Sequence, residues 1–145
     1  MKINIHGIIS MLIAMTAWII AIVLGFTNSM LVGNIGIIVT FVALMIIIRS
    51  YCSKCPGRNG HCSHHIFGKV ARVFNDRCHL SYDKKDIVIV STSLIIMLTT
   101  HLWMLIPHKT WMLIYLVLNS IAVGEILMYV CPNCLNRKCP LNRIK

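Results

Sequence analysis

The charged residues divide the chain into long apolar runs and two polar segments. No Lys, Arg, Asp or Glu lies between Lys2 and Arg49. A single helix over that stretch would be about 69 Å long, whereas the hydrocarbon core of a bilayer is about 30 Å thick. The run therefore has to fold back once. Thr27-Asn28-Ser29 is the natural turn, and Gly33-Asn34 is the alternative.

Two more apolar runs follow the central polar segment, and only the short turn Pro107-His108-Lys109-Thr110 separates them. The pattern predicts an all-α integral membrane protein with four transmembrane helices arranged as two hairpins. The expected spans lie near residues 8–26, 30–48, 87–106 and 111–130. On the first of them Ala17, Ala21 and Gly25 recur every fourth residue, which predicts a face that packs closely against another helix.

Composition supports this class and limits the partners. The chain has 145 residues, which is the length of one domain, and 57% of them are hydrophobic. Only 12% are charged, against roughly 25% in soluble proteins. The net charge is +10, but the charges lie outside the apolar runs. They therefore indicate membrane topology and attraction to an anionic bilayer, and nucleic acid is not an expected partner.

The basic residues fall almost entirely on one side of the predicted bundle. With four spans, the N-terminus, the loop at residues 50–86 and the tail at residues 131–145 share one face, and Lys109 is alone on the other. The shared face carries Lys2, Arg49, Lys54, Arg58, Lys69, Arg72, Arg77, Lys84, Lys85, Arg137, Lys138, Arg143 and Lys145. This asymmetry predicts that both termini and the loop are cytoplasmic in a multi-pass protein of the inner or plasma membrane.

The central loop also contains a stretch with helical periodicity. Over residues 64–74 the apolar side chains recur on one side and the basic ones lie elsewhere. The apolar set is Ile66, Phe67, Val70, Val73 and Phe74, and the basic residues are Lys69 and Arg72. This pattern predicts a short amphipathic helix that lies at the membrane interface.

Six of the seven cysteines form two similar triads on the predicted cytoplasmic face. The first is Cys52-x-x-Cys55 followed by Cys62, and the second is Cys131-x-x-Cys134 followed by Cys139. Thiols stay reduced in the cytosol, so a cysteine cluster there is more typical of metal binding or catalysis than of a disulfide framework. Two thiolates at C-x-x-C spacing can reach one metal ion from a tight turn. We therefore expect both triads to be metal ligands.

The identity of the metal is less sharply indicated. The repeated C-x-x-C and the Cys-Pro at residues 139–140 resemble bacterial ferredoxins, which favours an iron–sulfur cluster. Cys131-Pro-Asn-Cys134 also resembles a zinc knuckle, which makes Zn the second candidate. Each triad is one ligand short of a tetrahedral site. The further candidate ligands are Cys78, His61, His64, His65 and His79. Alternatively, both triads bind one shared site, or two chains of a homodimer complete each other's sites.

Glu125 and His101 are ionisable residues inside the predicted spans. Glu125 is the only carboxylate there, about a turn and a half before Cys131. It is a candidate proton site, or alternatively an ion-pair partner of Arg49 near the headgroups. His101 lies near the far end of the third span, where an interfacial position is the favoured interpretation.

These features favour a small membrane redox protein with metal centres. It would pass electrons from a soluble, acidic donor to a membrane carrier or a larger membrane complex. One alternative is a zinc-binding membrane protein for metal sensing or handling, and another is a membrane thiol oxidoreductase. The four-span, cysteine-bearing plan resembles the DsbB and vitamin K epoxide reductase type of oxidoreductase. Those proteins place their working cysteines toward the oxidising side, whereas the charges here place them inside.

Overall fold

The computed structural model describes residues 5–56, 65–75, 77–134, 136, 139 and 140 of the chain. These residues form helices, turns and loops, and the described part contains no strand. The helices are α1 (Ile5–Asn28), α2 (Met30–Ser50), η1 (Cys52–Lys54), α3 (His65–Ala71), α4 (Lys84–Leu105), α5 (Lys109–Glu125) and η3 (Ile126–Val130). The predicted all-α class is confirmed for the described residues. Four helical stretches are long and apolar enough to cross a membrane: α1, α2 with η1, α4, and α5 with η3.

Both predicted reversals lie where the sequence places them. α1 ends at Asn28 and α2 begins at Met30, with Ser29 between them. The Ser29 hydroxyl accepts a hydrogen bond from the Val32 backbone N–H at 3.2 Å, which caps the new helix. The second reversal lies between Leu105 and Lys109. It contains a proline, which cannot donate the backbone hydrogen bond needed to continue the helix.

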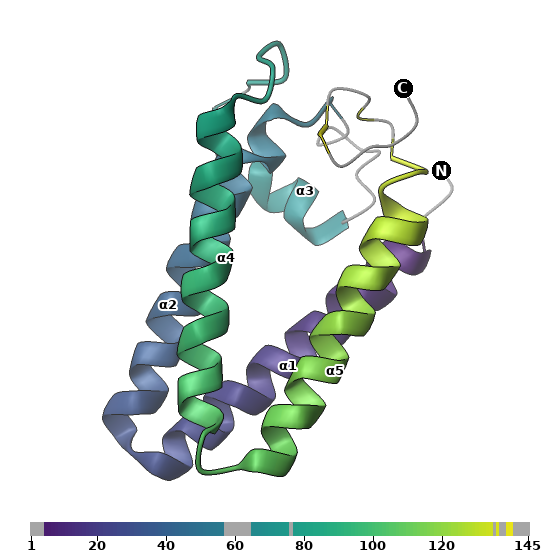
Figure 1. Cartoon of the computed structure of the whole chain (residues 1–145). Coiled ribbons are helices and arrows are strands. Elements are labelled where there is room, and N and C mark those ends of the chain that lie inside the picture. The colour runs from purple at the N-terminus through teal and green to yellow at the C-terminus, as the bar shows by residue number, and fades with distance from the viewer. Residues whose placement is uncertain (1–4, 57–64, 76, 135, 137–138, 141–145) are drawn as a thin grey trace.

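The four long helices pack as two neighbouring pairs. α1 lies along α5 and α2 lies along α4, and α1 also contacts α2 and α4. In Figure 1 the pairs diverge toward the end that carries both chain termini, and α3 lies at that end. The outward faces carry large exposed apolar side chains, among them Ile19, Phe41, Ile95 and Leu113. Such a surface is compatible with a multi-pass membrane protein, because lipid rather than water would cover it.

Small residues let α1 approach its neighbours. Ala17 and Ala21 are completely buried against Leu105 and Tyr115, and Gly25 is also buried. A Cβ atom on Gly25 would clash with the Met104 methyl carbon, so a larger residue there would displace that side chain. The packing face predicted from the four-residue spacing is therefore confirmed.

A buried polar trio joins three of the long helices. His101 on α4 is completely buried, with its Nε2 atom 2.9 Å from the Thr40 hydroxyl and its Nδ1 atom 3.0 Å from the Tyr115 hydroxyl. Thr40 donates its own proton to the Gly36 carbonyl at 2.7 Å. His101 Nε2 therefore donates to Thr40, and Nδ1 accepts from Tyr115. These two partners hold the imidazole inside the bundle, and the interfacial depth expected for His101 stays a prediction.

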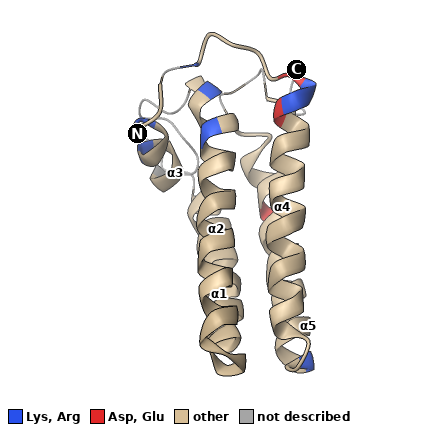
Figure 2. Ribbon diagram, turned by 90° about the vertical axis from the view of Figure 1, so that its left-hand side faces the viewer, with Lys and Arg blue, Asp and Glu red and all other residues tan. Residues whose placement is uncertain are grey.

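The central loop contains a short helix that ends earlier than the sequence suggests. The helical spacing extends to Phe74, whereas α3 ends at Ala71 and the next residues form turns. Ile66 and Val73 are 51% and 85% exposed, so part of the apolar side of this segment faces outward. The described Lys and Arg residues gather at this end of the molecule, and the other end carries the lysine that begins α5 (Figure 2).

The trio makes a prediction about stability. Thr40→Val removes the acceptor of the His101 N–H and should lower the free energy of unfolding in detergent by about 1 kcal/mol, as buried intramembrane hydrogen bonds do. Thr99 is the matched control, because its hydroxyl also donates to a carbonyl of its own helix but is exposed. Thr99→Val should therefore leave equilibrium unfolding almost unchanged. Equal losses in the two variants would contradict a role for the contact with His101.

Candidate functional site

Each C-x-x-C pair is held in a tight turn at the end of an apolar helix. In the first turn the Cys55 backbone N–H donates to the Cys52 carbonyl at 3.2 Å, directly after α2. In the second turn the Cys134 N–H donates to the Cys131 carbonyl at 3.3 Å, directly after η3. The same backbone arrangement therefore presents both pairs, although they are far apart in the sequence.

The two turns meet through their sulfur atoms. The Cys55 thiol donates a hydrogen bond to the sulfur of Cys134, and this bond lowers the pKa of Cys134 to about 6. Burial opposes the shift, and a hydrogen bond from the Asn136 backbone N–H assists it. Cys134 is therefore mainly a thiolate at neutral pH, and the sulfur of Cys55 from the other triad lies beside it.

A tyrosine from the central loop organises the surroundings of these sulfurs. The Tyr82 hydroxyl donates to the Tyr51 carbonyl at 3.1 Å and accepts from the Asn136 side-chain amide at 2.7 Å. Burial raises the pKa of Tyr82, and the nearby charges of cysteines from both triads raise it further; those cysteines are Cys55, Cys139 and Cys52. Tyr82 therefore stays neutral, and its hydroxyl links the residues next to the first triad with those next to the second through hydrogen bonds.

A buried ion pair fixes the first turn to the start of α4. Lys54 lies inside the first C-x-x-C and is only 3% exposed. Its ammonium group pairs with the Asp86 carboxylate and donates to the Ser81 carbonyl at 3.1 Å. A buried ammonium group without such partners would be costly, so these contacts determine the position of the turn.

Cys78 joins the first triad rather than the second. Its thiol donates to the Cys55 carbonyl at 3.2 Å, and the neighbouring Arg77 backbone N–H donates to the Ser53 carbonyl at 3.2 Å. These bonds bring the segment after α3 beneath the first C-x-x-C. Cys78 thus lies beside the first C-x-x-C turn, and its role as an additional ligand stays a prediction.

The other candidate ligands are not drawn together in the part of the chain that is described. His79 is exposed. Cys62, His61 and His64, together with the side chain of His65, lie outside the described residues. Among the described residues no group of three or more Cys, His, Asp or Glu side chains is arranged as metal ligands are. The contact between the sulfur atoms of Cys55 and Cys134 therefore defines the candidate site.

Glu125 finds a different partner from the one considered from the sequence. Its carboxylate lies 2.8 Å from His6 Nδ1, and no ion pair with Arg49 occurs among the described residues. The His6 ring also stacks on Tyr129, with centroids 4.5 Å apart. The start of α1 is thereby attached to η3, a π-helical turn in which the Cys131 N–H donates to the Ile126 carbonyl. π-Helical turns often occur near functional sites, and this one leads directly into the second triad.

Sequence reasoning missed the polar residues that support the cysteines. Tyr82, Asn136 and the Lys54–Asp86 pair carry no motif of their own. Two weak signals were available: a lysine inside a C-x-x-C pair, and a tyrosine in a polar loop. Neither identifies a partner.

Comparison with known proteins adds no further information. The chain matches no protein-family model, no curated protein and no solved structure. Its chemistry must therefore be inferred from its own residues.

The sulfur contact makes a prediction about pH. In reduced, metal-free protein the alkylation rate of Cys134 should rise with a midpoint near pH 6, because the reactive thiolate forms as pH increases through its pKa. Cys55→Ser replaces the thiol donor by a hydroxyl, and Cys55→Ala removes the hydrogen bond. The midpoint should move upward most in Cys55→Ala. Mass spectrometry of the labelled peptide gives the rate.

Asn133→Ala is the matched control, because Asn133 lies in the same turn but its amide bonds only to the Tyr129 carbonyl. Its midpoint should stay near that of the native chain. A midpoint close to the ordinary thiol value of about 8.5 in the native chain would contradict the contact.

Proposed function

We propose that this chain is a multi-pass membrane protein whose two cysteine triads form one thiolate centre at the cytosolic membrane surface. The centre binds a metal, with an iron–sulfur cluster favoured, and passes electrons between a soluble donor and a membrane carrier or complex. The observation that carries the proposal is the hydrogen bond between Cys55 and Cys134, which joins the two triads. A shared centre accounts for the fact that each triad alone is one ligand short.

The donor set fits a soft metal ion. Thiolates rather than thiols bind metals, and Cys134 is already a thiolate at neutral pH. Cys52 and Cys139 lie close enough to Tyr82 for their charges to act on it, as does Cys55. Sulfur donors from both triads therefore lie near Tyr82, although among the described residues they are not arranged as metal ligands are. Cys55, Cys134, Cys52 and Cys139 are the residues that would hold the metal.

The remaining residues have identifiable tasks around this centre. Lys54 and Asp86 fix the first turn, while Asn136 and Tyr82 fix the second turn against it. A sulfur-ligated iron centre supplies one-electron transfer, which zinc cannot. The basic residues at the same end of the molecule would attract an acidic electron donor. The charge asymmetry of the whole sequence supports a cytosolic position for this end.

A membrane thiol oxidoreductase is the second candidate, and the same sulfur contact favours it. The Cys55 thiol and the Cys134 thiolate are placed to form a disulfide. That oxidation releases two electrons and one proton, and a quinone that takes one further proton from water would be reduced to the quinol. A zinc protein for metal handling is the third candidate, supported by the resemblance of the second turn to a zinc knuckle.

Metal content and colour of the full-length protein test the proposal. Anaerobically purified protein should contain iron and inorganic sulfide and show broad absorbance near roughly 400 nm, as sulfur-bound iron does. Cys55→Ser and Cys134→Ser should each remove nearly all of the metal, because both residues belong to one centre. Asn133→Ser, in the same turn as Cys134, should retain it.

Three results would contradict the proposal in different ways. A loss of about half of the metal in each cysteine variant would indicate two separate centres. A colourless protein with stoichiometric zinc would exclude electron transfer and favour metal handling. Metal-free protein in which Cys55 and Cys134 cycle between thiols and a disulfide would favour the oxidoreductase.

A further inference from the structure

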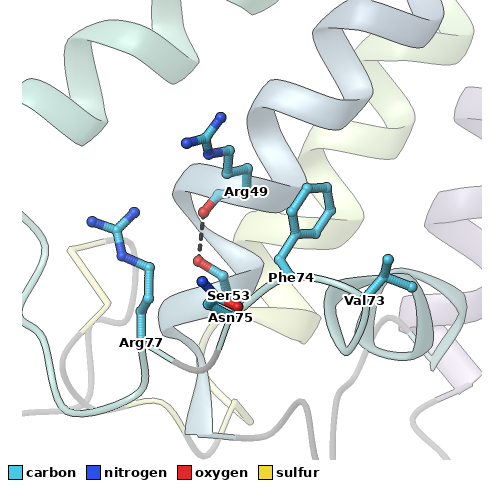
Figure 3. A pocket seen from close by; sticks show the side chains of 6 residues that line it. All are labelled: Arg49, Ser53, Val73, Phe74, Asn75 and Arg77. Atoms are coloured by element: carbon cyan, nitrogen blue, oxygen red, sulfur yellow. Dashed lines mark hydrogen bonds between the residues drawn. The ribbon is translucent and has the colours of Figure 1, made fainter.

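A pocket lies at the cysteine-bearing end of the molecule, against the first C-x-x-C turn. It has a volume of about 370 Å³ and is lined by Arg49, Ser53, Val73, Phe74, Asn75 and Arg77. In Figure 3 the two arginine side chains extend in the same direction, while Phe74 and Val73 lie toward α3. The pocket therefore combines two positive charges with an apolar side.

Ser53 bonds to the backbone of both arginines. This residue is completely buried. Its hydroxyl donates to the Arg49 carbonyl, as Figure 3 shows, and its carbonyl accepts from the Arg77 backbone N–H. Arg49 comes from the last turn of α2, whereas Arg77 comes from the segment after α3. The fold thus brings two arginines that are distant in the sequence to one pocket.

The described lining of the pocket contains two arginines and no carboxylate. The ion pairs found among the described residues join His6 to Glu125 and Lys54 to Asp86, and neither involves these arginines. The Asp86 carboxylate is close enough to Arg77 for the two charges to interact, but it already pairs with Lys54. Asp76, next to Arg77, lies outside the described residues. Two guanidinium groups beside an amide suit a phosphate, which arginine can bind through two parallel hydrogen bonds.

We propose that this pocket binds the phosphate of an anionic phospholipid. Arg49 lies in the last turn of an apolar helix long enough to span a bilayer, which is the level of the lipid headgroups. Val73, on the pocket wall, is 85% exposed. An exposed valine beside two arginines fits a lipid, whose acyl chains begin next to its phosphate. A soluble phosphate compound would leave that valine in water.

The inference rests on the insertion of the four helices in a bilayer and not on the metal centre. Its failure is therefore distinguishable from that of the proposed function. A protein that holds iron but binds no lipid here would contradict only the lipid site. The pocket also lies against the first C-x-x-C turn through Ser53, so a bound lipid would anchor that turn at the membrane surface.

Lipid titration of the full-length protein in a neutral detergent tests the site. Dioctanoyl phosphatidylglycerol should bind saturably, as followed by native mass spectrometry, and dioctanoyl phosphatidylcholine should bind more weakly because its phosphate is neutralised. Arg49→Gln and Arg77→Gln should each weaken binding of the anionic lipid about fivefold, as loss of one basic residue at an anionic membrane surface does. Lys69→Gln is the matched control, because Lys69 is exposed on α3 and does not line the pocket.

Conservative variants separate a built site from general attraction. Arg49→Lys and Arg77→Lys keep the charge but lose the planar fork, so each should also weaken binding, whereas diffuse attraction would be unaffected. Unfolding midpoints without lipid establish that the variants are folded. Equal weakening in Lys69→Gln, or no saturable binding, would overturn the proposal. Inorganic phosphate or glycerol phosphate that binds with the same arginine dependence, while the lipid does not, would overturn the lipid as the source.

Discussion

The hydrogen bond between Cys55 and Cys134 depends on where the helices that precede these two cysteines end. Each cysteine follows directly on an apolar helix, and each helix ends at the same end of the molecule because two tight reversals lie at the other. The sulfurs meet only if α2 and α5 have matching lengths and directions. Two further contacts support the meeting point, one between Tyr82 and Asn136 and one between Lys54 and Asp86. A site made from two short loops thus acquires a rigid frame.

The long helices form that frame through close packing and a few hydrogen bonds between side chains. Small residues on α1 permit close packing, and the trio of Thr40, His101 and Tyr115 joins α2, α4 and α5 by hydrogen bonds. Because apolar surfaces gain nothing from association inside lipid, close packing and buried hydrogen bonds determine how such helices pair. At the site end the attachment of His6 to Glu125 and Tyr129 connects α1 to the second triad. The packing of the helices therefore determines the relative positions of the thiols.

The charge pattern and the turn residues predict the four helices because a helix that crosses a bilayer needs an apolar run of a fixed length. The same applies to Ala17, Ala21 and Gly25, whose spacing reports a packing face. Contacts between residues on different helices or loops cannot be predicted in this way. His101 lies 61 residues from Thr40, and Tyr82 lies 54 residues from Asn136, so no local pattern relates them. The spacing of the triads identifies the cysteines as candidate site residues, but the contact of Cys55 with Cys134 is visible only in the fold. The same is true of Glu125, which pairs with His6 and not with Arg49 among the described residues.

The central claim is that the two triads form one cluster, and a chemical cross-link between them tests it most directly. The test uses a variant in which every cysteine except Cys55 and Cys134 is replaced by serine. Dibromobimane becomes fluorescent when it bridges two neighbouring thiols. The account predicts rapid bridging within single chains in native membranes. A control chain with Cys55 and Lys109→Cys, at opposite ends of the bundle, should not be bridged. Bridging of the Cys55–Cys134 pair no faster than that control would contradict the account.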